Sequence, residues 1–251
     1  MVKQGVNIVW FKRDLRLHDH EPLCKAIDAG RHVVMLFIFE PIIRQHPDWS
    51  PRHWQYIFKS IQELNQSLKN YKGCINTFYG SATEIFSKLN QDYDLNAIYS
   101  HAETGVKVTF DRDKQLKNFL EEKNIGWHEF QTNGVVRGIK NRDLWDKSWQ
   151  HFMRSPLQSP NLSKARFITT DKPLPTHSLQ IIKKYPENFQ PAGSNKAYQY
   201  LDSFLTNRIG KYNLFISKPE GSRRHCSRLS PYLAWGNISM RKVTQKTLEA
   251  R

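Results

Sequence analysis

A short run near the end of the chain, CSRLSPYLAWGN from Cys226 to Asn237, gathers residue types that bind anions. Ser230 followed by Pro231 predicts a helix whose N-cap is Ser230 and whose first turn contains the proline, and the first backbone N–H groups of a helix have no partner within it. Ser227 adds a hydroxyl donor, and positive charge comes from Arg223, Arg224 and Arg228. Phosphate or pyrophosphate is stabilised by such free amides and by the helix dipole. Any Ser-Pro helix start shares this geometry, so a purely structural cap is the alternative interpretation.

A second dense group of chemically active residues lies in VNIVWFKRDLRLHDHEPL, from Val6 to Leu23. An apolar run is followed there by charged residues and histidines, without a glycine or a turn cluster between them. One hypothesis is a metal site built from His18, Asp19 and His20. Adjacent residues on an extended chain point to alternate faces, which argues against three ligands converging there.

Short apolar runs alternate with longer helical patterns in the first half of the chain, as in a parallel sheet covered by helices. The run from His32 to Phe39 is apolar on both faces, as a central parallel strand should be. We therefore predict an α/β domain over residues 1–132, with a doubly wound, Rossmann-like parallel sheet. Its five expected strands are Val6–Phe11, His32–Phe39, Cys74–Gly80, Asn96–Ala102 and Gly126–Thr132.

The helices between these strands also have recognisable ends. Pro22 can begin a helix that Gly30 terminates. Ser81 and Glu84 have the spacing of a capping box, in which the two residues cap each other's backbone N–H groups. The remaining two helices of this domain are expected over residues 51–68 and 110–124.

The alternating pattern breaks over residues 133–191, which we interpret as an interdomain connection. Its SPLQSPNLS and TTDKPLPTHS stretches are rich in proline and serine, and only residues 142–155 predict a helix. Residues 192–251 predict the beginning of an all-α domain. It should contain one helix over residues 194–213, a basic loop over 217–228, and a last helix capped by Ser239.

The overall composition narrows the class of partner. Lysine and arginine number 38 against 23 aspartate and glutamate, which gives a formal charge of +15 and a pI near 9.7. This charge favours a polyanionic partner such as nucleic acid, with a solubilising surface as the alternative. Three cysteines without a CxxC pair predict neither a disulfide framework nor a thiolate metal site. Because there is no signal-peptide pattern and no membrane-length apolar run, we expect a cytoplasmic protein that does not bind membranes.

Both dense groups resemble motifs of the photolyase and cryptochrome family. The first is similar to the family pattern W-F-[RK]-x-D-L-R-x-x-D, matched by Trp10, Phe11, Lys12, Asp14, Leu15, Arg16 and Asp19. The second is similar to S-x-L-S-x-x-L-x-x-G-x-[IV]-S, which lies at the flavin-phosphate site of the family. It is matched by Ser227, Leu229, Ser230, Leu233, Gly236, Ile238 and Ser239. Two long motifs in the right order form a specific signal, and the likeness covers the whole chain.

The resemblance implies an FAD cofactor that uses light-driven electron transfer to repair ultraviolet-induced pyrimidine dimers in DNA. The cofactor-binding residues that it implies are Tyr212, Cys226, Ser227, Arg228, Leu229 and Ser230. Cys226 replaces the usual threonine of the family, which removes a hydroxyl donor but leaves a backbone N–H. We assign no catalytic residue and no metal ligand. By the same resemblance, ion pairs and hydrogen bonds at the domain contact are expected of Asp14, Arg16 and Asp19.

The family often holds an antenna chromophore, a folate or a deazaflavin, in its α/β domain. Residues Ser100–Gly105 follow the fourth strand, where doubly wound sheets place ligands, although Glu103 could equally cap the next helix. The residues that surround the flavin ring in relatives would lie beyond residue 251. We therefore expect a fragment, a split product or a truncated form of a photolyase-like protein, which is monomeric and does not repair DNA alone. A signalling cryptochrome and a nucleotide-binding α/β module are the alternatives that the residues leave open.

Overall fold

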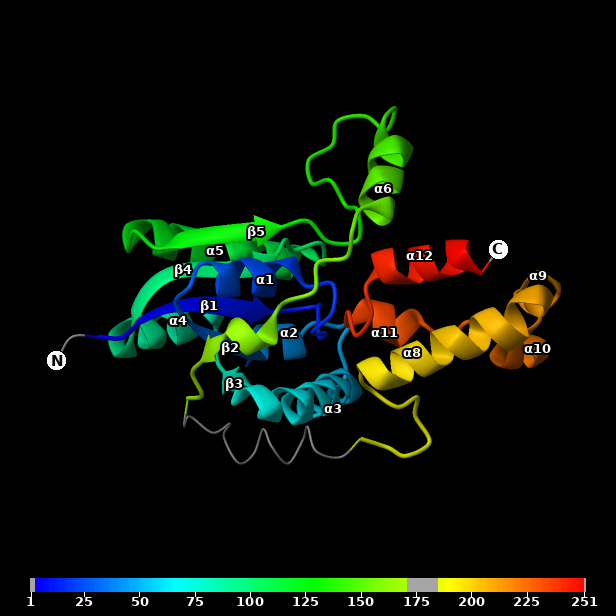
Figure 1. Cartoon of the computed structure of the whole chain (residues 1–251), viewed down its shortest axis with the longest axis horizontal. Helices are drawn as coiled ribbons and strands as arrows, with labels where there is room; N and C mark the ends of the chain where they lie inside the picture. The colour runs from blue at the N-terminus through cyan, green and yellow to red at the C-terminus, as the bar shows by residue number, and fades with distance from the viewer. Residues whose placement is uncertain (1–2, 171–184, 251) are drawn as a thin grey trace.

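The computed structural model describes residues 3–170 and 185–250, and its central feature is a parallel β-sheet (Figure 1). The strand order is β3-β2-β1-β4-β5, and a short sixth strand, β6 (Arg166–Phe167), pairs in parallel with the start of β2. This confirms the predicted five-stranded doubly wound sheet. The five main strands are β1 (Gly5–Phe11), β2 (His32–Phe39), β3 (Ile75–Tyr79), β4 (Asp94–His101) and β5 (Gly126–Phe130).

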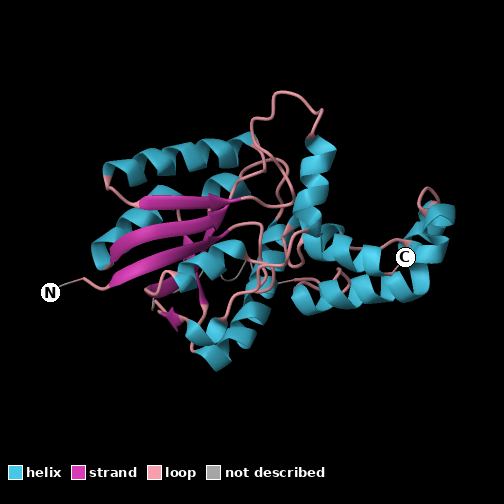
Figure 2. Ribbon diagram, turned by 45° about the horizontal axis from the view of Figure 1, so that its top comes forward, coloured by secondary structure: helices cyan, strands magenta, loops and turns pink. Residues whose placement is uncertain are grey.

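Helices cover both faces of this sheet (Figure 2). Successive side chains of a strand point to opposite faces, so Val9 and Phe11 of β1 join one core while Ile8 and Trp10 join the other. The first core contains α1 (Glu21–Asp28) and α3 (Pro51–Leu68), and the second contains α4 (Ala82–Asp92) and α5 (Lys107–Glu122). None of the helices in the described ranges is long and apolar enough to cross a membrane.

The local signals for these helices are confirmed where the hydrogen bonds can be checked. Ser81 accepts from the backbone N–H of Glu84, and Glu84 accepts from that of Ser81, which completes the capping box. The sequence patterns did not reveal the short helix α2 (Pro41–Arg44) or β6. Two residues of strand carry no periodicity, so β6 could not be recognised in the sequence.

The connection between the α/β part and the helical part, residues 133–191, is held in place partly by pairing with the sheet. It contains α6 (Trp145–Arg154), which is shorter than the helix predicted over residues 142–155, then a 3-10 turn (Leu162–Lys164) and β6. Beyond β6, Asn76 of β3 accepts hydrogen bonds from the backbone N–H and the hydroxyl of Thr170. Most of the proline-rich stretch TTDKPLPTHS lies outside the described residues.

The C-terminal part is helical, but two of its predicted boundaries were wrong. The expected helix over residues 194–213 divides into α8 (Ser194–Ser203), a π-helical turn (Phe204–Arg208), a 3-10 turn (Ile209–Lys211) and α9 (Tyr212–Phe215). The expected basic loop contains α10 (Pro219–His225), because a proline in the first turn is compatible with a helix start. The last two helices are α11 (Ser230–Ala234) and α12 (Met240–Glu249), and Ser239 caps α12 by accepting from the Lys242 N–H.

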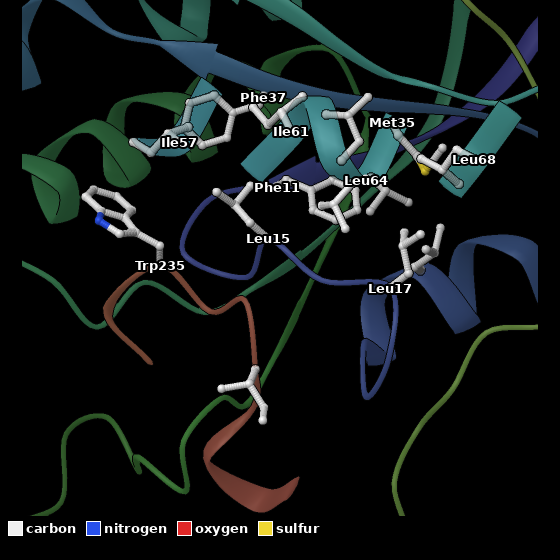
Figure 3. Packing of buried hydrophobic residues seen from close by; sticks show 14 of the residues in the cluster. Phe11, Leu15, Leu17, Met35, Phe37, Ile57, Ile61, Leu64, Leu68 and Trp235 are labelled. Atoms are coloured by element: carbon white, nitrogen blue, oxygen red, sulfur yellow. The ribbon is translucent and has the colours of Figure 1, made fainter. Parts of the chain in front are cut away.

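The helical part shares a core with the α/β part. Trp235, which follows α11, lies near Leu15 of the N-terminal loop and Ile57 of α3 (Figure 3). Tyr232 and Leu229 belong to the same buried cluster as the first face of the sheet. Burial of apolar surface therefore holds the two parts of the chain together.

Candidate functional site

An open cleft of about 800 Å³ lies between α3 and the loop that precedes α11. We call it the Ser227 cleft. All six residues that the family resemblance assigned to the cofactor line it, namely Tyr212, Cys226, Ser227, Arg228, Leu229 and Ser230. The fold therefore brings Tyr212, which begins α9, next to a loop that follows it by more than a dozen residues in the sequence.

The loop in the cleft is shaped by an unusual backbone conformation. Cys226 is the C-cap of α10, and Arg228 has a φ of 62°, in the left-handed region that few residues other than glycine adopt. Leu229, with φ −86° and ψ −10°, is the N-cap of α11, so the prediction that Ser230 is the N-cap was wrong by one residue. No side chain caps this helix, because the leucine side chain at the N-cap has no hydrogen-bond acceptor.

Only some of the polar groups of this loop are free to meet a ligand. The backbone N–H of Cys226, expected as a ligand donor, already donates to the Ser222 carbonyl at 2.8 Å. The Ser227 hydroxyl accepts from the Leu229 N–H at 3.4 Å. The amides of Ser227 and Arg228 have no acceptor among the residues that the structure describes. These two amides and the hydroxyls of Ser227 and Ser230 are donors that this side of the cleft can offer.

Two side chains hold the loop in place. The Arg208 guanidinium donates to the Cys226 carbonyl at 2.5 Å and to the Tyr200 carbonyl at 2.8 Å. Gln190 donates through Nε2 to the Arg228 carbonyl at 2.5 Å, and it accepts from Arg228 Nη2 at 3.3 Å. The loop is thus positioned from both sides before any ligand arrives, which lowers the cost of binding.

The sequence patterns missed the opposite wall of the cleft. Arg52, His53 and Tyr56 of α3 line it, together with Tyr185, Phe189 and Gln190. The sequence of α3 has the pattern of an ordinary amphipathic helix. It therefore gave no indication that the first turn of α3 faces a cleft. Among the described residues that line the cleft there are two arginines and no carboxylate. This composition suits an anionic ligand.

Arg16 and Asp19 lie at the contact of the two parts, as expected, whereas the Asp14 side chain contacts only residues of the α/β part among those described. Arg241 of α12 forms an ion pair with Asp19 through two contacts, Nη2 to Oδ1 at 2.8 Å and Nε to Oδ2 at 3.1 Å. Arg16 donates to the Gly236 carbonyl at 3.2 Å, and the Leu15 N–H donates to the Trp235 carbonyl at 3.0 Å. The two motifs that resemble the family are thus packed against each other.

Asp14 forms a buried cluster with His20 and His101. It accepts from the Lys12 N–H at 2.7 Å, and its Oδ2 lies 2.6 Å from His101 Nδ1 and 3.1 Å from His20 Nε2. The last contact lacks hydrogen-bond geometry, so His20 Nε2 has no hydrogen-bond partner among the described residues. Burial by itself would raise the pKa of Asp14, but His20 and His101 lower it well below its ordinary value.

These three side chains are of metal-ligating type and lie close enough to share an ion. The hydrogen bonds argue against that role. His20 Nδ1 accepts from the Leu23 N–H at 3.2 Å, which places the ring proton of neutral His20 on Nε2, the atom that would have to bind a metal. The metal site considered from the sequence is also disfavoured, because its members diverge: His18 is exposed, Asp19 meets Arg241 and His20 faces Asp14.

The sheet has its topological switch point between β1 and β4, where doubly wound folds bind nucleotides. Ion pairs cross the space above it: Arg112 contacts Glu40 and Glu103 at 2.8 and 2.9 Å, and Lys12 contacts Asp113 at 3.1 Å. The two cavities left there measure about 30 and about 130 Å³. Ligand pockets usually exceed about 300 Å³, and both of these cavities are smaller.

The segment Ser100–Gly105 is accordingly occupied by structural contacts. Glu103 accepts from the backbone N–H groups of Thr104 and Gly105 at 2.9 and 2.7 Å, so it fixes the turn that leads into α5. A wider groove of about 930 Å³ lies farther out, beside the ends of β2 and β3. Unlike the Ser227 cleft, this groove has described lining residues of both charge signs, among them Glu40, Glu84, Lys107, Asp111 and Arg112.

Comparison with known proteins identifies the family. The sequence model of the DNA photolyase family matches residues 7–142. A deoxyribodipyrimidine photo-lyase of Alkalihalophilus pseudofirmus is 25% identical over 98% of this chain and 54% of its own length. The chain spans about half the length of this relative and of a deoxyribodipyrimidine photo-lyase of Buchnera aphidicola, which it also matches over nearly its whole extent.

Solved structures show the same fold. The archaeal photolyase of Sulfolobus tokodaii, crystallised with two FAD molecules, aligns with a TM-score of 0.74 at 23% identity, over 96% of this chain and 54% of its own. A cryptochrome of Synechocystis aligns with a TM-score of 0.79 at 19% identity, over all of this chain and 56% of its own. The family match, the relatives and the shared fold agree, and the chain belongs to the DNA photolyase family, which here includes cryptochromes.

Proposed function

We propose that this chain carries the diphosphate-binding part of the FAD site of a photolyase that repairs ultraviolet-induced pyrimidine dimers in DNA. The observation that carries the proposal is the Ser227 cleft. It brings together all six residues implied by the family motif, and its described lining contains arginines and no carboxylate. A dinucleotide brings two phosphate charges, which this lining can compensate without a competing acidic group.

The residues of the cleft have distinct roles in this proposal. The free amides of Ser227 and Arg228 and the Ser227 hydroxyl donate hydrogen bonds to the diphosphate. Gln190 and Arg208 hold this loop in the binding conformation. Tyr185 and Phe189 add aromatic surface to the lining of the cleft. When bound, FAD supplies the light-driven electron donation, and the protein supplies its position and surroundings.

Damaged DNA is the proposed substrate because of the charge and the relatives. The formal charge of +15 favours a phosphate backbone, and the matched relatives include a deoxyribodipyrimidine photo-lyase. The alternative is blue-light signalling without repair, and it is favoured by the cryptochrome that shares the fold over the whole chain. Both classes would use the same flavin site, so the cleft by itself does not separate them.

The test uses the longest natural polypeptide that contains this chain. The protein is purified in the dark, its bound flavin is measured by absorbance, and the reduced form is illuminated with DNA that contains pyrimidine dimers. We expect dimer content to fall with light and to stay constant in the dark. Unchanged dimer content despite fully reduced flavin would exclude repair and favour signalling. Absence of flavin from a folded preparation that also takes up no added FAD would exclude both.

A further inference from the structure

Arg52 is the cationic side chain of the Ser227 cleft that comes from the α/β part of the chain. It lies in the first turn of α3, whereas Arg228 lies on the facing loop before α11. The two arginines therefore reach one cleft from segments that are 176 positions apart in the sequence. The family motif accounts for the Arg228 side and says nothing of α3.

The contacts of Arg52 leave its charge available. Its guanidinium lies 5.8 Å from the centre of the Phe189 ring, and no ion pair joins it to a carboxylate within residues 3–170 and 185–250. The other arginines near the cleft are engaged: Arg208 binds two backbone carbonyls, and Arg228 binds Gln190. Of these three arginines, Arg52 thus has the fewest hydrogen bonds and ion pairs with other described residues.

The surroundings of Arg52 also show that the cleft is electropositive. Burial lowers the pKa of His53, and the neighbouring Arg52 and Arg13 lower it further. His53 is therefore neutral at physiological pH, since a third positive charge would be repelled there. The rest of the described lining contains no aspartate and no glutamate. Nothing in the described lining offsets the charge of Arg52.

We propose that Arg52 binds the diphosphate of the cofactor from the side opposite Ser227, so that the bound cofactor ties α3 to the helical part. This inference rests on the proposed function, and it adds a residue of the α/β part to the cofactor site. A guanidinium can donate two parallel hydrogen bonds to a phosphate, which a lone ammonium cannot. The bound ligand then adds a charged bridge to contacts that already join α3 to the helical part, which include apolar packing and the hydrogen bond from the Tyr56 hydroxyl to Asn237 Oδ1 at 2.9 Å.

The experiment compares Arg52→Ala and Arg52→Gln with the matched control Arg44→Ala. Arg44 is also exposed and also lies 5.8 Å from an aromatic ring centre, that of Trp54, but it does not line the cleft. Affinity for FAD is measured on flavin-free full-length protein, and inorganic pyrophosphate and adenosine are tested as competitors. We expect the dissociation constant for FAD to rise about tenfold in both Arg52 variants and less than twofold in Arg44→Ala.

The competitors separate a diphosphate contact from a general loss of structure. Pyrophosphate should compete about tenfold more weakly in the Arg52 variants, whereas adenosine should compete equally in all proteins. FAD and pyrophosphate affinities equal to those of Arg44→Ala would overturn the inference. So would an equal weakening of pyrophosphate and adenosine, because that result indicates disturbed folding. The proposed function fails separately, if the unsubstituted protein binds no FAD.

Discussion

Gly236 lies directly against the backbone of Arg13, so closely that an added Cβ would be 2.2 Å from the Arg13 carbonyl oxygen. The same Cβ would be 2.6 Å from the Asp14 Cα. Gly236 also has a φ of +66°, which is unfavourable for residues with a side chain. The glycine of the second motif is therefore required by its contact with the first motif, and this contact helps to set the position of the Ser227 cleft relative to α3.

Gly236→Ala should destabilise the protein by about 3 kcal/mol or more, since backbone strain and a clash with main-chain atoms act together. Gly210→Ala is the matched control, because Gly210 is exposed and its added Cβ would meet nothing within 4 Å. Thermal and urea unfolding measure both variants. Equal stability of the two would show that the close approach of Gly236 to Arg13 does not constrain the fold.

The Asp19–Arg241 pair gives a second prediction about the contact between the two parts. Both side chains are buried, with exposed fractions of 3% and 8%, so Arg241→Ala leaves the Asp19 carboxylate buried without its cation. We expect a loss of about 3–5 kcal/mol in the free energy of unfolding. Lys246→Ala breaks the solvent-exposed pair with Glu249 and should cost less than about 1 kcal/mol. Similar losses in the free energy of unfolding for Arg241→Ala and Lys246→Ala, measured with urea, would contradict this ranking.

Much of the fold could be predicted because its signals are local. The apolar run of β2 and the capping box of Ser81 and Glu84 each depend on residues that are close in the sequence. The errors arose where distant residues decide the outcome. β6 forms because two residues of the connection pair with the start of β2. The N-cap of α11 is Leu229 and not Ser230, within a loop that Gln190 and Arg208 hold through hydrogen bonds.

The candidate site divides in the same way. The Ser227–Ser230 wall could be found because the family motif is contiguous. The facing wall of Arg52 and Tyr56 could not, because its residues have the pattern of any amphipathic helix. His101 also gave no signal, since only the parallel pairing of β1 and β4 brings its strand beside the one that leads to Asp14.

The buried cluster around Asp14 predicts a loss of stability in mild acid. Burial lowers the pKa of His101 to about 4, against the opposing effect of Asp14, whereas an unfolded histidine has a pKa near 6.5. His101 therefore contributes stability that is fully present above about pH 6.5 and is lost as the pH falls toward 4. Between pH 7.5 and pH 5 the expected loss is about 2 kcal/mol.

The matched variant for this effect is His101→Asn, which can keep a donor to Asp14 but does not titrate. Between pH 7.5 and pH 5, its free energy of unfolding, measured with urea, should fall by about 2 kcal/mol less than that of the unsubstituted protein. Asp14 itself does not interfere, because its lowered pKa affects stability only below its unfolded value near 3.8. An unchanged pH dependence in the variant would assign the acid sensitivity to other groups.

Replacement of both serines of the cleft tests the cofactor assignment. Ser227→Ala with Ser230→Ala removes two hydroxyl groups from the lining while leaving the backbone path intact, and we expect FAD occupancy after purification to fall several-fold. Ser222→Ala is the control, since its hydroxyl donates to the Pro219 carbonyl and does not face the cleft. Wild-type flavin absorbance in the double variant would show that the diphosphate lies elsewhere.

Cys226 offers the opposite test, a substitution that should strengthen binding. The family resemblance implies threonine at this position, and the backbone N–H of Cys226 cannot compensate because it donates to the Ser222 carbonyl. Cys226→Thr places a hydroxyl donor on the lining of the cleft, and one added hydrogen bond should tighten FAD binding by about two- to tenfold. Cys226→Val, which has a similar shape without the hydroxyl, should show no gain. Equal affinities of the threonine and valine variants in a flavin titration would mean that this side chain does not reach the cofactor, and the diphosphate would then have to lie nearer to Arg228 and Ser230.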